Sequence, residues 1–285
     1  MSASAMTPAE IAQWRQQHPQ LFSSGLRYRT LVYGAWLLFF ALVLFALWRV
    51  DASPVRIWNG LDKLGFLVRL MIPPSPGGEL PEYLYALAET LAMAFLGTLF
   101  AALFALPLGF MAAKNAMPNW LVRFLCRRFS DSVRGIDTLI FALIFVAAVG
   151  MGPFAGILAI IIGDLGMFMK LFSEAIENAD NKPVEGVKSS GAGHLMRMRF
   201  GILPQVLPIM LSHVLYFFES NTRSAAILGM VGAGGIGLQL SEAMRGNNWD
   251  NAAFIICMIL VMVAIIDFMS KKIRSKIIGQ QAYRP

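Results

Sequence analysis

The chain has 285 residues, of which 57% are hydrophobic and only 14% are charged, with a net charge of +7. A soluble domain carries about 25% charged residues, so this composition excludes a soluble enzyme and predicts an all-α, polytopic membrane protein. The basic excess then predicts positively charged cytoplasmic loops rather than nucleic-acid binding. The two cysteines, Cys126 and Cys257, form neither a disulfide framework nor a metal pair and are interpreted as small apolar side chains.

The first 82 residues are expected to contain one membrane span. Residues 1–30 hold three arginines and lack the apolar core and cleavage site of a signal peptide, so they are expected to form a cytoplasmic tail. Residues 31–82 are expected to hold the first span, which ends at Arg49, and then a periplasmic connection. Within that connection, apolar residues at helical spacing predict an amphipathic helix on the membrane surface: Ile57, Leu61, Leu64 and Val68.

The next apolar runs predict spans two to four. The second span lies in the uncharged run between Glu89 and Lys114. The sequence GMGP at 150–153 interrupts the following run and predicts a break there. Two spans, at about 135–150 and 152–170, place two basic segments on the same side of the membrane, as the positive-inside preference requires. Those segments are the loops at 114–134 and 170–204.

The last two spans complete a model of six. The fifth span starts near Gln205, the sixth covers about 251–270, and residues 273–285 are expected to form a cytoplasmic tail. The permease region proper is expected to cover residues 83–272. With both termini in the cytoplasm, 18 of the 24 lysines and arginines lie on the cytoplasmic side, which supports this orientation.

A glycine cluster follows the fifth span. Its spacing matches the GxGxxG fingerprint of dinucleotide-binding proteins, but a membrane helix precedes it and Cys257 stands where an acidic residue is needed. The cluster is instead interpreted as a bend that forms a periplasmic gate or hinge at the mouth of a pathway. Close helix packing through small residues is the alternative. The four residues concerned are Gly232, Gly234, Gly235 and Gly237.

A polar loop at 173–204 carries a recognisable pattern. In PVEGVKSSGAGHLMRMRFGILPQVLP, Gly191 follows Glu185 by six residues and the pair Leu203–Pro204 closes the stretch. This resembles the EAA loop of ABC importer permeases, which reads E-A-A, three residues, G, nine residues, I-x-L-P. The departures from that pattern are Gly186 and Val187 for the two alanines and Gly201 for the isoleucine.

The residues of this loop predict two short helices that present apolar side chains. Gly191 is expected to end the first helix, and GHLMRMRF begins the second, with Leu195 among its apolar residues. A helix that only lies on the membrane surface is the alternative. The resemblance implies that the loop docks into an ATPase subunit and couples it to transport. The coupling residues it implies are Glu185, Gly186, Gly191, Leu195, Leu203 and Pro204.

Four further segments extend the resemblance over about residues 82–272: FVAAVGMGPFAG, GILPQVLP, FESNTRSAAILGMVGAGGIG and EAMRG. They are similar to the permeases of phosphonate-type ABC importers, including relatives that carry phosphite or hypophosphite. The resemblance implies a MetI-like type I importer permease fold with about six transmembrane helices. It also implies residence in the bacterial inner membrane and uptake of a phosphorus oxyanion.

The same resemblance implies the partners of the chain. They are an ABC ATPase dimer that holds ATP and Mg, a periplasmic solute-binding protein, and a second permease copy that is identical or paralogous. The chain itself has no Walker A sequence, so it is not expected to hydrolyse ATP. No catalytic residue, cofactor site or metal site is expected in it.

Span five carries polar residues, which are costly inside a bilayer. Glu219 and Arg223 are four positions apart and share one helical face, so they can pair. The pair either serves only to join helices, or Arg223 also provides a weak path for an anion. An ion-coupled secondary transporter that uses Glu219 is the alternative function. The pathway residues expected are Glu219, Ser220, Asn221, Arg223 and Ser224.

Overall fold

The computed structural model describes residues 26–279 and contains helices but no strand in that range. The chain divides into two units, residues 1–68 and 69–285, which we describe separately. Five helices are long and apolar enough to cross a membrane, and a bent helix pair makes a sixth candidate. The prediction of an all-α polytopic fold with about six membrane helices is therefore confirmed.

The first unit contains two helices. Helix α3 (Leu26–Arg49) agrees with the predicted first span, because an apolar run within it is long enough to cross a bilayer. Helix α4 (Pro54–Leu70) forms where the apolar spacing predicted an amphipathic helix. Arg56, in the first turn of α4, donates to the carboxylate of Asp51 in the preceding turn at 2.9 Å. Most of the tail predicted at 1–30, and residues 280–285 of the tail at its other end, lie outside the described residues.

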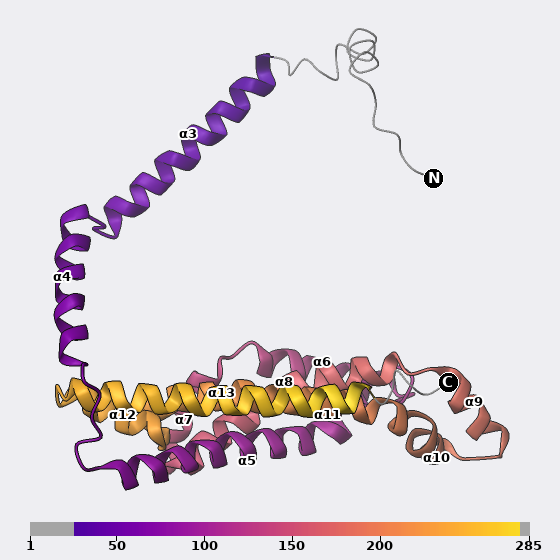
Figure 1. Cartoon of the computed structure of the whole chain (residues 1–285). Helices are drawn as coiled ribbons and strands as arrows, with labels where there is room; N and C mark the ends of the chain where they lie inside the picture. Colours follow the sequence, from indigo (N-terminus) through magenta and orange to yellow (C-terminus); the bar gives the residue numbers. More distant parts are fainter. Residues whose placement is uncertain (1–25, 280–285) are drawn as a thin grey trace, which may run out of the picture. The chain divides into compact units, whose positions relative to one another are not determined.

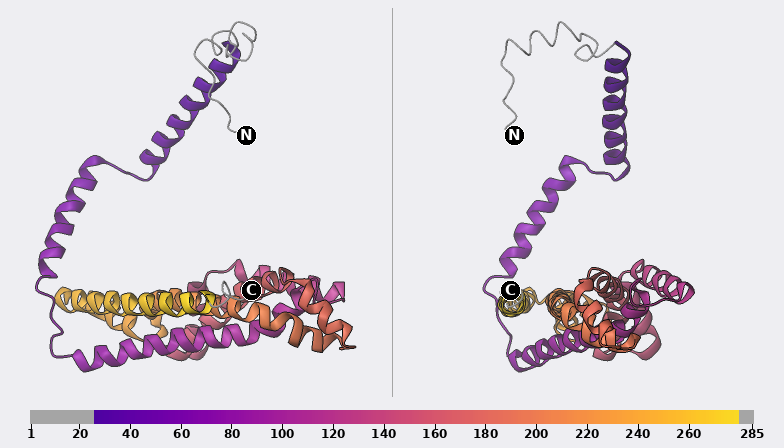
Figure 2. Two further views of the ribbon diagram at one scale, coloured as in Figure 1. Left: turned by 45° about the vertical axis from the view of Figure 1, so that its right-hand side comes forward. Right: turned by 90° about the vertical axis from the view of Figure 1, so that its right-hand side faces the viewer.

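The second unit is a bundle with helix α8 at its centre. Helix α8 contacts α5, α7 and α11, and α13 packs against α11 (Figure 1). Small residues allow the close approach of backbones: Gly97 of α5 lies against Ile160, and Gly156 of α8 lies against Met93. Figure 2 shows the bundle along and across its axis. Its long helices are α5 (Leu80–Ala112), α8 (Pro153–Glu177), α11 (Leu203–Leu228) and α13 (Trp249–Gly279).

The third predicted span is wrong in its extent. Helix α7 (Thr138–Val149) begins and ends near the predicted positions, but its 12 residues are too few. At about 1.5 Å per residue they cover roughly 18 Å, less than the 30 Å of a hydrocarbon core. The predicted loop 114–134 contains helix α6 (Trp120–Arg134). Helices α6 and α7 are long and apolar enough to cross a membrane only when they are taken together, as a pair bent by 85°. The break predicted at GMGP is confirmed, with φ of +93° at Gly150.

The other long helices extend beyond the predicted spans. Helix α5 begins at Leu80, α8 continues to Glu177, and α13 continues to Gly279. The predicted boundaries at 83, 173 and 273 therefore fall inside helices. Hydropathy marks only the apolar part of such a helix, whereas the helix itself continues through charged residues that form ion pairs.

Short helices close the two ends of this bundle. The loop end comprises the last turns of α5 and α8 together with α9 (Asn181–Ser189), α10 (His194–Arg197) and η1 (Met198–Ile202). The glycine end comprises the start of α5, the connection between α7 and α8, and the turn from α11 to α13. That turn contains η2 (Gly229–Ala233) and α12 (Ile236–Arg245).

Candidate functional site

The predicted coupling loop forms two short helices, as expected. Glu185 and Gly186 lie on α9, which ends at Ser189. Gly191 follows with φ of +79°, a left-handed conformation that a β-branched residue adopts only with strain. The chain then enters α10, which carries Leu195. The pair Leu203–Pro204 begins α11, where the missing amide hydrogen of a proline is tolerated.

The tip of the loop end is apolar and uncovered. Leu195 is 82% exposed, Met196 is 58% exposed and Phe200 is 57% exposed. Met198, in the same stretch, packs instead against a cluster of buried core residues. Exposed apolar side chains at the end of a polar loop mark a surface that another protein or a membrane covers.

Hydrogen bonds tie the predicted loops 114–134 and 170–204 to each other. The Lys114 amide donates to Glu177 at 2.6 Å, and the Asn115 side chain donates to the Ile176 carbonyl at 2.7 Å. A ring nitrogen of His194 lies 2.7 Å from the Ala116 carbonyl oxygen. The two loops therefore lie at the same end of the bundle, as the charge distribution predicted.

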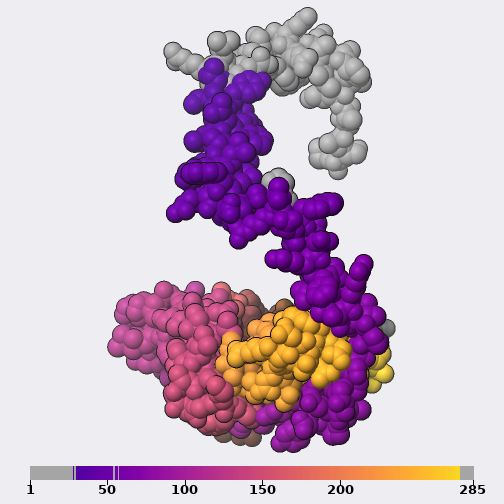
Figure 3. Space-filling view, turned by 90° about the vertical axis from the view of Figure 1, so that its left-hand side faces the viewer, coloured from indigo at the N-terminus to yellow at the C-terminus, as the bar shows by residue number. Residues whose placement is uncertain are grey.

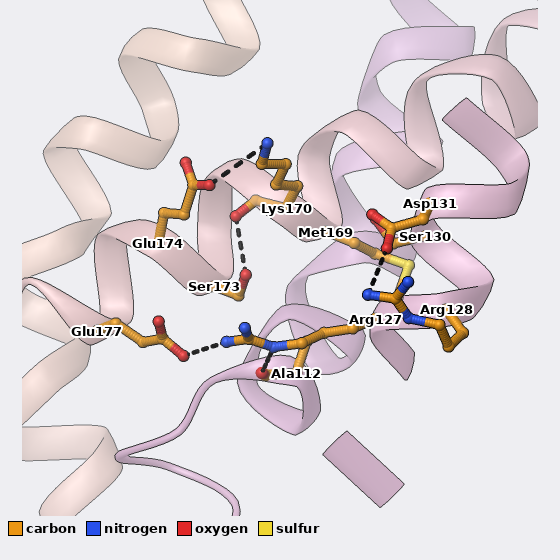
Figure 4. Close-up of a pocket in the computed structure, with 10 residues that line it drawn as sticks. All are labelled: Ala112, Arg127, Arg128, Ser130, Asp131, Met169, Lys170, Ser173, Glu174 and Glu177. Atoms are coloured by element: carbon orange, nitrogen blue, oxygen red, sulfur yellow. Dashed lines mark hydrogen bonds and ion pairs between the residues drawn. The ribbon is translucent and has the colours of Figure 1, made fainter. Parts of the chain in front are cut away.

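One ion pair joins α6 to α8 beside this loop end. Arg127 pairs with Glu177, and its Nε donates to the Ala112 carbonyl at 3.0 Å. Lys170 lies 3.7 Å from Glu174 on α8. These side chains line a small pocket of about 190 Å³ (Figure 4). Its cations and carboxylates occur in equal number, so they neutralise each other and fasten the two helices.

The glycine cluster contains both a bend and a close packing contact, each at different residues. Gly232, Gly234 and Gly235 have φ of +100°, +81° and +69°, so they form the predicted bend. Gly237 lies inside α12, where an added β-carbon would overlap the carbonyl oxygen of Ala226. It therefore serves close packing between α11 and α12.

The bend is fastened to two other parts of the chain. The Gly152 amide donates to the Gly232 carbonyl at 3.0 Å, which joins the α7–α8 break to η2. Glu89 of α5 accepts from the Gly235 amide at 3.1 Å, and Thr90 accepts from the Ile236 amide at 2.8 Å. Helix α5 thus supplies the cap that α12 lacks in its own sequence.

Figure 3 looks onto the glycine end, where the orange residues of η2 and α12 lie between purple α5 and pink residues from the middle of the chain. A surface pocket of about 510 Å³ opens here, and its lining includes Glu82, Glu89 and Gln239. In the sequence, a carboxylate next to a hydroxyl at the start of an apolar run indicates that Glu89 and Thr90 mark an interface or a helix end rather than a pathway. The structure agrees with that interpretation and supplies their partners, Gly235 and Ile236.

The structure divides the predicted pathway residues between two faces of α11. Asn221 is buried, and its side chain donates to Thr98 of α5 at 2.8 Å and to Asp164 of α8 at 2.5 Å. Ser220 and Ser224 are half-buried and share the more exposed face with Arg223, whose side chain is 45% exposed. The Asn221 side chain therefore joins α11 to α5 and α8, whereas the Arg223 side chain lies on a different, more exposed face of α11.

The predicted contact between Glu219 and Arg223 is present at 3.8 Å, but each has a closer partner on α13. Arg274 donates to Glu219 at 2.7 Å, and Arg223 donates to Asp267 at 3.0 Å. Sequence reasoning missed Arg274 because it placed that residue in a tail. It missed Asp267, which lies in the predicted sixth span, because that residue is 44 positions from Arg223 along the chain. Asp267 and Arg274 are seven positions apart on α13, a spacing that places two residues on one helical face.

These features define a multi-pass membrane transport component. Residues 105–279 match the family described as the binding-protein-dependent transport system inner membrane component, which is more than half of the chain. The chain belongs to this family. It is therefore a transport subunit and not an enzyme in its own right.

Two relatives and one solved structure place the chain within the family. It is 37% identical to the phosphite transport system permease protein PtxC of Stutzerimonas stutzeri, over 82% of this chain and 86% of that protein. It is also 37% identical to the phosphate-import permease protein PhnE of Mycolicibacterium smegmatis, over 84% of this chain and 44% of that longer protein. The inward-facing MetNI methionine ABC transporter shares the fold, with a TM-score of 0.61 at 21% identity over 68% of this chain and 95% of that chain.

Proposed function

We propose that the chain is the permease subunit of an ATP-driven importer for a phosphorus oxyanion such as phosphonate, phosphite or hypophosphite. The observation that carries the proposal is the loop end, where the complete EAA spacing from Glu185 to Pro204 forms two helices with an exposed apolar tip. The relatives named for phosphite transport and phosphate import supply the substrate class.

In this proposal the loop end faces the cytoplasm and docks into a dimer of ATPase subunits, which binds ATP and Mg. A periplasmic solute-binding protein delivers the anion at the glycine end. A second permease copy, identical or paralogous, completes the pathway. Both termini then lie in the cytoplasm of a bacterium, and the chain lies in its inner membrane.

The pathway is proposed to follow the exposed face of α11. Ser220, Arg223 and Ser224 share that face, and hydroxyl groups beside one compensated cation give an oxyanion a weak site that does not trap it. Glu219 is buried and neutralised by Arg274, so we assign it to structure. Asn221 is likewise assigned to helix packing rather than to the pathway.

Uptake by proteoliposomes tests this function. The permease is reconstituted with its ATPase and solute-binding partners, and uptake of phosphite is measured with ATP inside, without ATP, and with only a proton or sodium gradient. The expected result is uptake that requires ATP. Uptake driven by an ion gradient without ATP would instead establish the secondary transporter that uses Glu219.

A further inference from the structure

A network of five charged side chains joins α11 to α13, and the proposed pathway uses only one of them. Asp267 lies at its centre, 3.0 Å from Arg223 and 4.0 Å from Lys271. Glu219 lies 3.8 Å from Arg223 and 2.7 Å from Arg274. Every carboxylate in the network thus contacts two cations.

The network carries one more positive charge than negative charge. Glu219 and Arg274 neutralise each other on its buried side, where their side chains are 8% and 23% exposed. The remaining part consists of Arg223, Asp267 and Lys271, and it has a net charge of +1. The excess charge is accessible, because the side chains of Arg223 and Lys271 are 45% and 70% exposed.

Several large apolar side chains are exposed near this excess charge. On the same exposed side of α11 lie Tyr216 and Ile227, which are 50% and 52% exposed. Beside Lys271 on α13, Phe268 is 68% exposed. A cation placed in hydrocarbon is unfavourable, so charged side chains of membrane helices face a pathway or another protein. Asp267 also directly follows the uncharged run of α13, which places the network at one edge of the apolar layer.

We propose that Arg223 and Lys271 form a transfer site for the oxyanion. The Asp267 carboxylate competes with the oxyanion for these two cations. This inference rests on the proposed function and extends it to α13. An arriving oxyanion takes the place of the Asp267 carboxylate beside the two cations, and Asp267 pairs with them again when the anion leaves. Competition of this kind keeps the anion weakly bound, as transport requires.

A pair of neighbouring lysines provides the test. Lys271→Gln removes the excess charge, whereas Lys272→Gln removes an exposed lysine for which the structure records no ion pair among the described residues. ATP-driven uptake of phosphite is measured in proteoliposomes that contain the complete transporter. We expect Lys271→Gln to lower uptake per ATP hydrolysed roughly three- to tenfold, the effect of one screened unit charge. Lys272→Gln should change it less than about twofold.

Asp267→Asn tests the competitor directly. Without the carboxylate the site retains the anion, so phosphite placed inside the vesicles should inhibit uptake at a lower concentration than in the wild type. Asp267→Glu should restore the wild-type concentration dependence. Equal uptake by Lys271→Gln and Lys272→Gln would overturn the transfer site. Absence of ATP-driven phosphite uptake by the wild type would instead overturn the proposed function.

Discussion

At the loop end, α9 contains no buried residue and Leu195 is 82% exposed, whereas at the glycine end Gly229 and Gly237 pack directly against backbone atoms. The loop end is open, and its outermost side chains have few neighbours in the chain. The glycine end is fastened by bonds from α5 and from the α7–α8 break. The difference teaches that the tip of the loop end leaves an apolar surface free for the partner that we propose, while the glycine end is closely packed within the chain. Substitutions should therefore impair assembly at the first end and folding at the second.

The largest effect is expected at Gly237. Its substitution by alanine places a β-carbon into the Ala226 carbonyl, so α12 must move away from α11. We expect a loss of about 3 kcal/mol or more and little folded protein in the membrane. Gly186→Ala is the matched control at the loop end, where nothing lies within 4 Å of the added carbon. Membrane abundance and thermal unfolding in detergent are measured for both variants. Equal abundance of the two variants would contradict the difference expected between the two ends.

Leu195→Asp is expected to have the next largest effect, on assembly rather than folding. A buried contact at the centre of an interface often contributes about 2 kcal/mol or more, so ATP-driven uptake should fall at least roughly tenfold at normal abundance. Leu195→Met keeps the apolar volume and should retain most of the activity. If Leu195→Asp transports normally, Leu195 does not contact the ATPase.

A smaller effect is expected at Gly191. Its φ of +79° places valine in a left-handed conformation that costs about 1–2 kcal/mol, although no neighbour blocks the side chain. The strain is confined to the turn between α9 and α10, so Gly191→Val should fold and yet lose part of the coupling between ATP hydrolysis and uptake. The ratio of phosphite taken up to ATP hydrolysed measures this, and an unchanged ratio would contradict the assignment.

Thr90→Val is expected to lower stability at the glycine end and to have the smallest effect on coupled uptake. It removes the oxygen that accepts from the buried Ile236 amide and leaves that amide without a partner, which costs about 1–3 kcal/mol. Thermal unfolding of the purified protein measures this loss. Ser132→Ala is the control, because Ser132 is exposed and its hydroxyl donates, among the described residues, only to the Arg128 carbonyl of its own helix. Equal destabilisation by the two changes would show that Thr90 does not fasten α12.

The sequence correctly predicted those features of the backbone that depend on one residue and its neighbours along the chain. The break at Gly191 and the bend at Gly232 each follow from the backbone freedom of glycine. The third span was wrong because a hydropathy criterion finds continuous apolar runs. Helix α6 is amphipathic, and arginines interrupt its apolar residues along the sequence, so it was interpreted as a loop.

Contacts between distant residues could not be predicted in the same way. Glu89 bonds to Gly235 and Glu219 to Arg274, and in each case the two residues come from different helices. A charged residue in an apolar run shows that a partner is needed, but only the fold shows which one. The pairing of Glu219 with Arg223 was predicted because both lie on one helix, and the closer partners on α13 were missed for the opposite reason.

The most direct test of the contrast between the two ends is site-directed cross-linking to the ATPase subunit. In a variant without Cys126 and Cys257, a cysteine is introduced either at Leu195 or at Met151, which are 82% and 79% exposed at opposite ends of the bundle. The complete transporter is treated with a short bifunctional thiol reagent. The account predicts a permease–ATPase product with Leu195→Cys and none with Met151→Cys. A product with Met151→Cys and none with Leu195→Cys would contradict it.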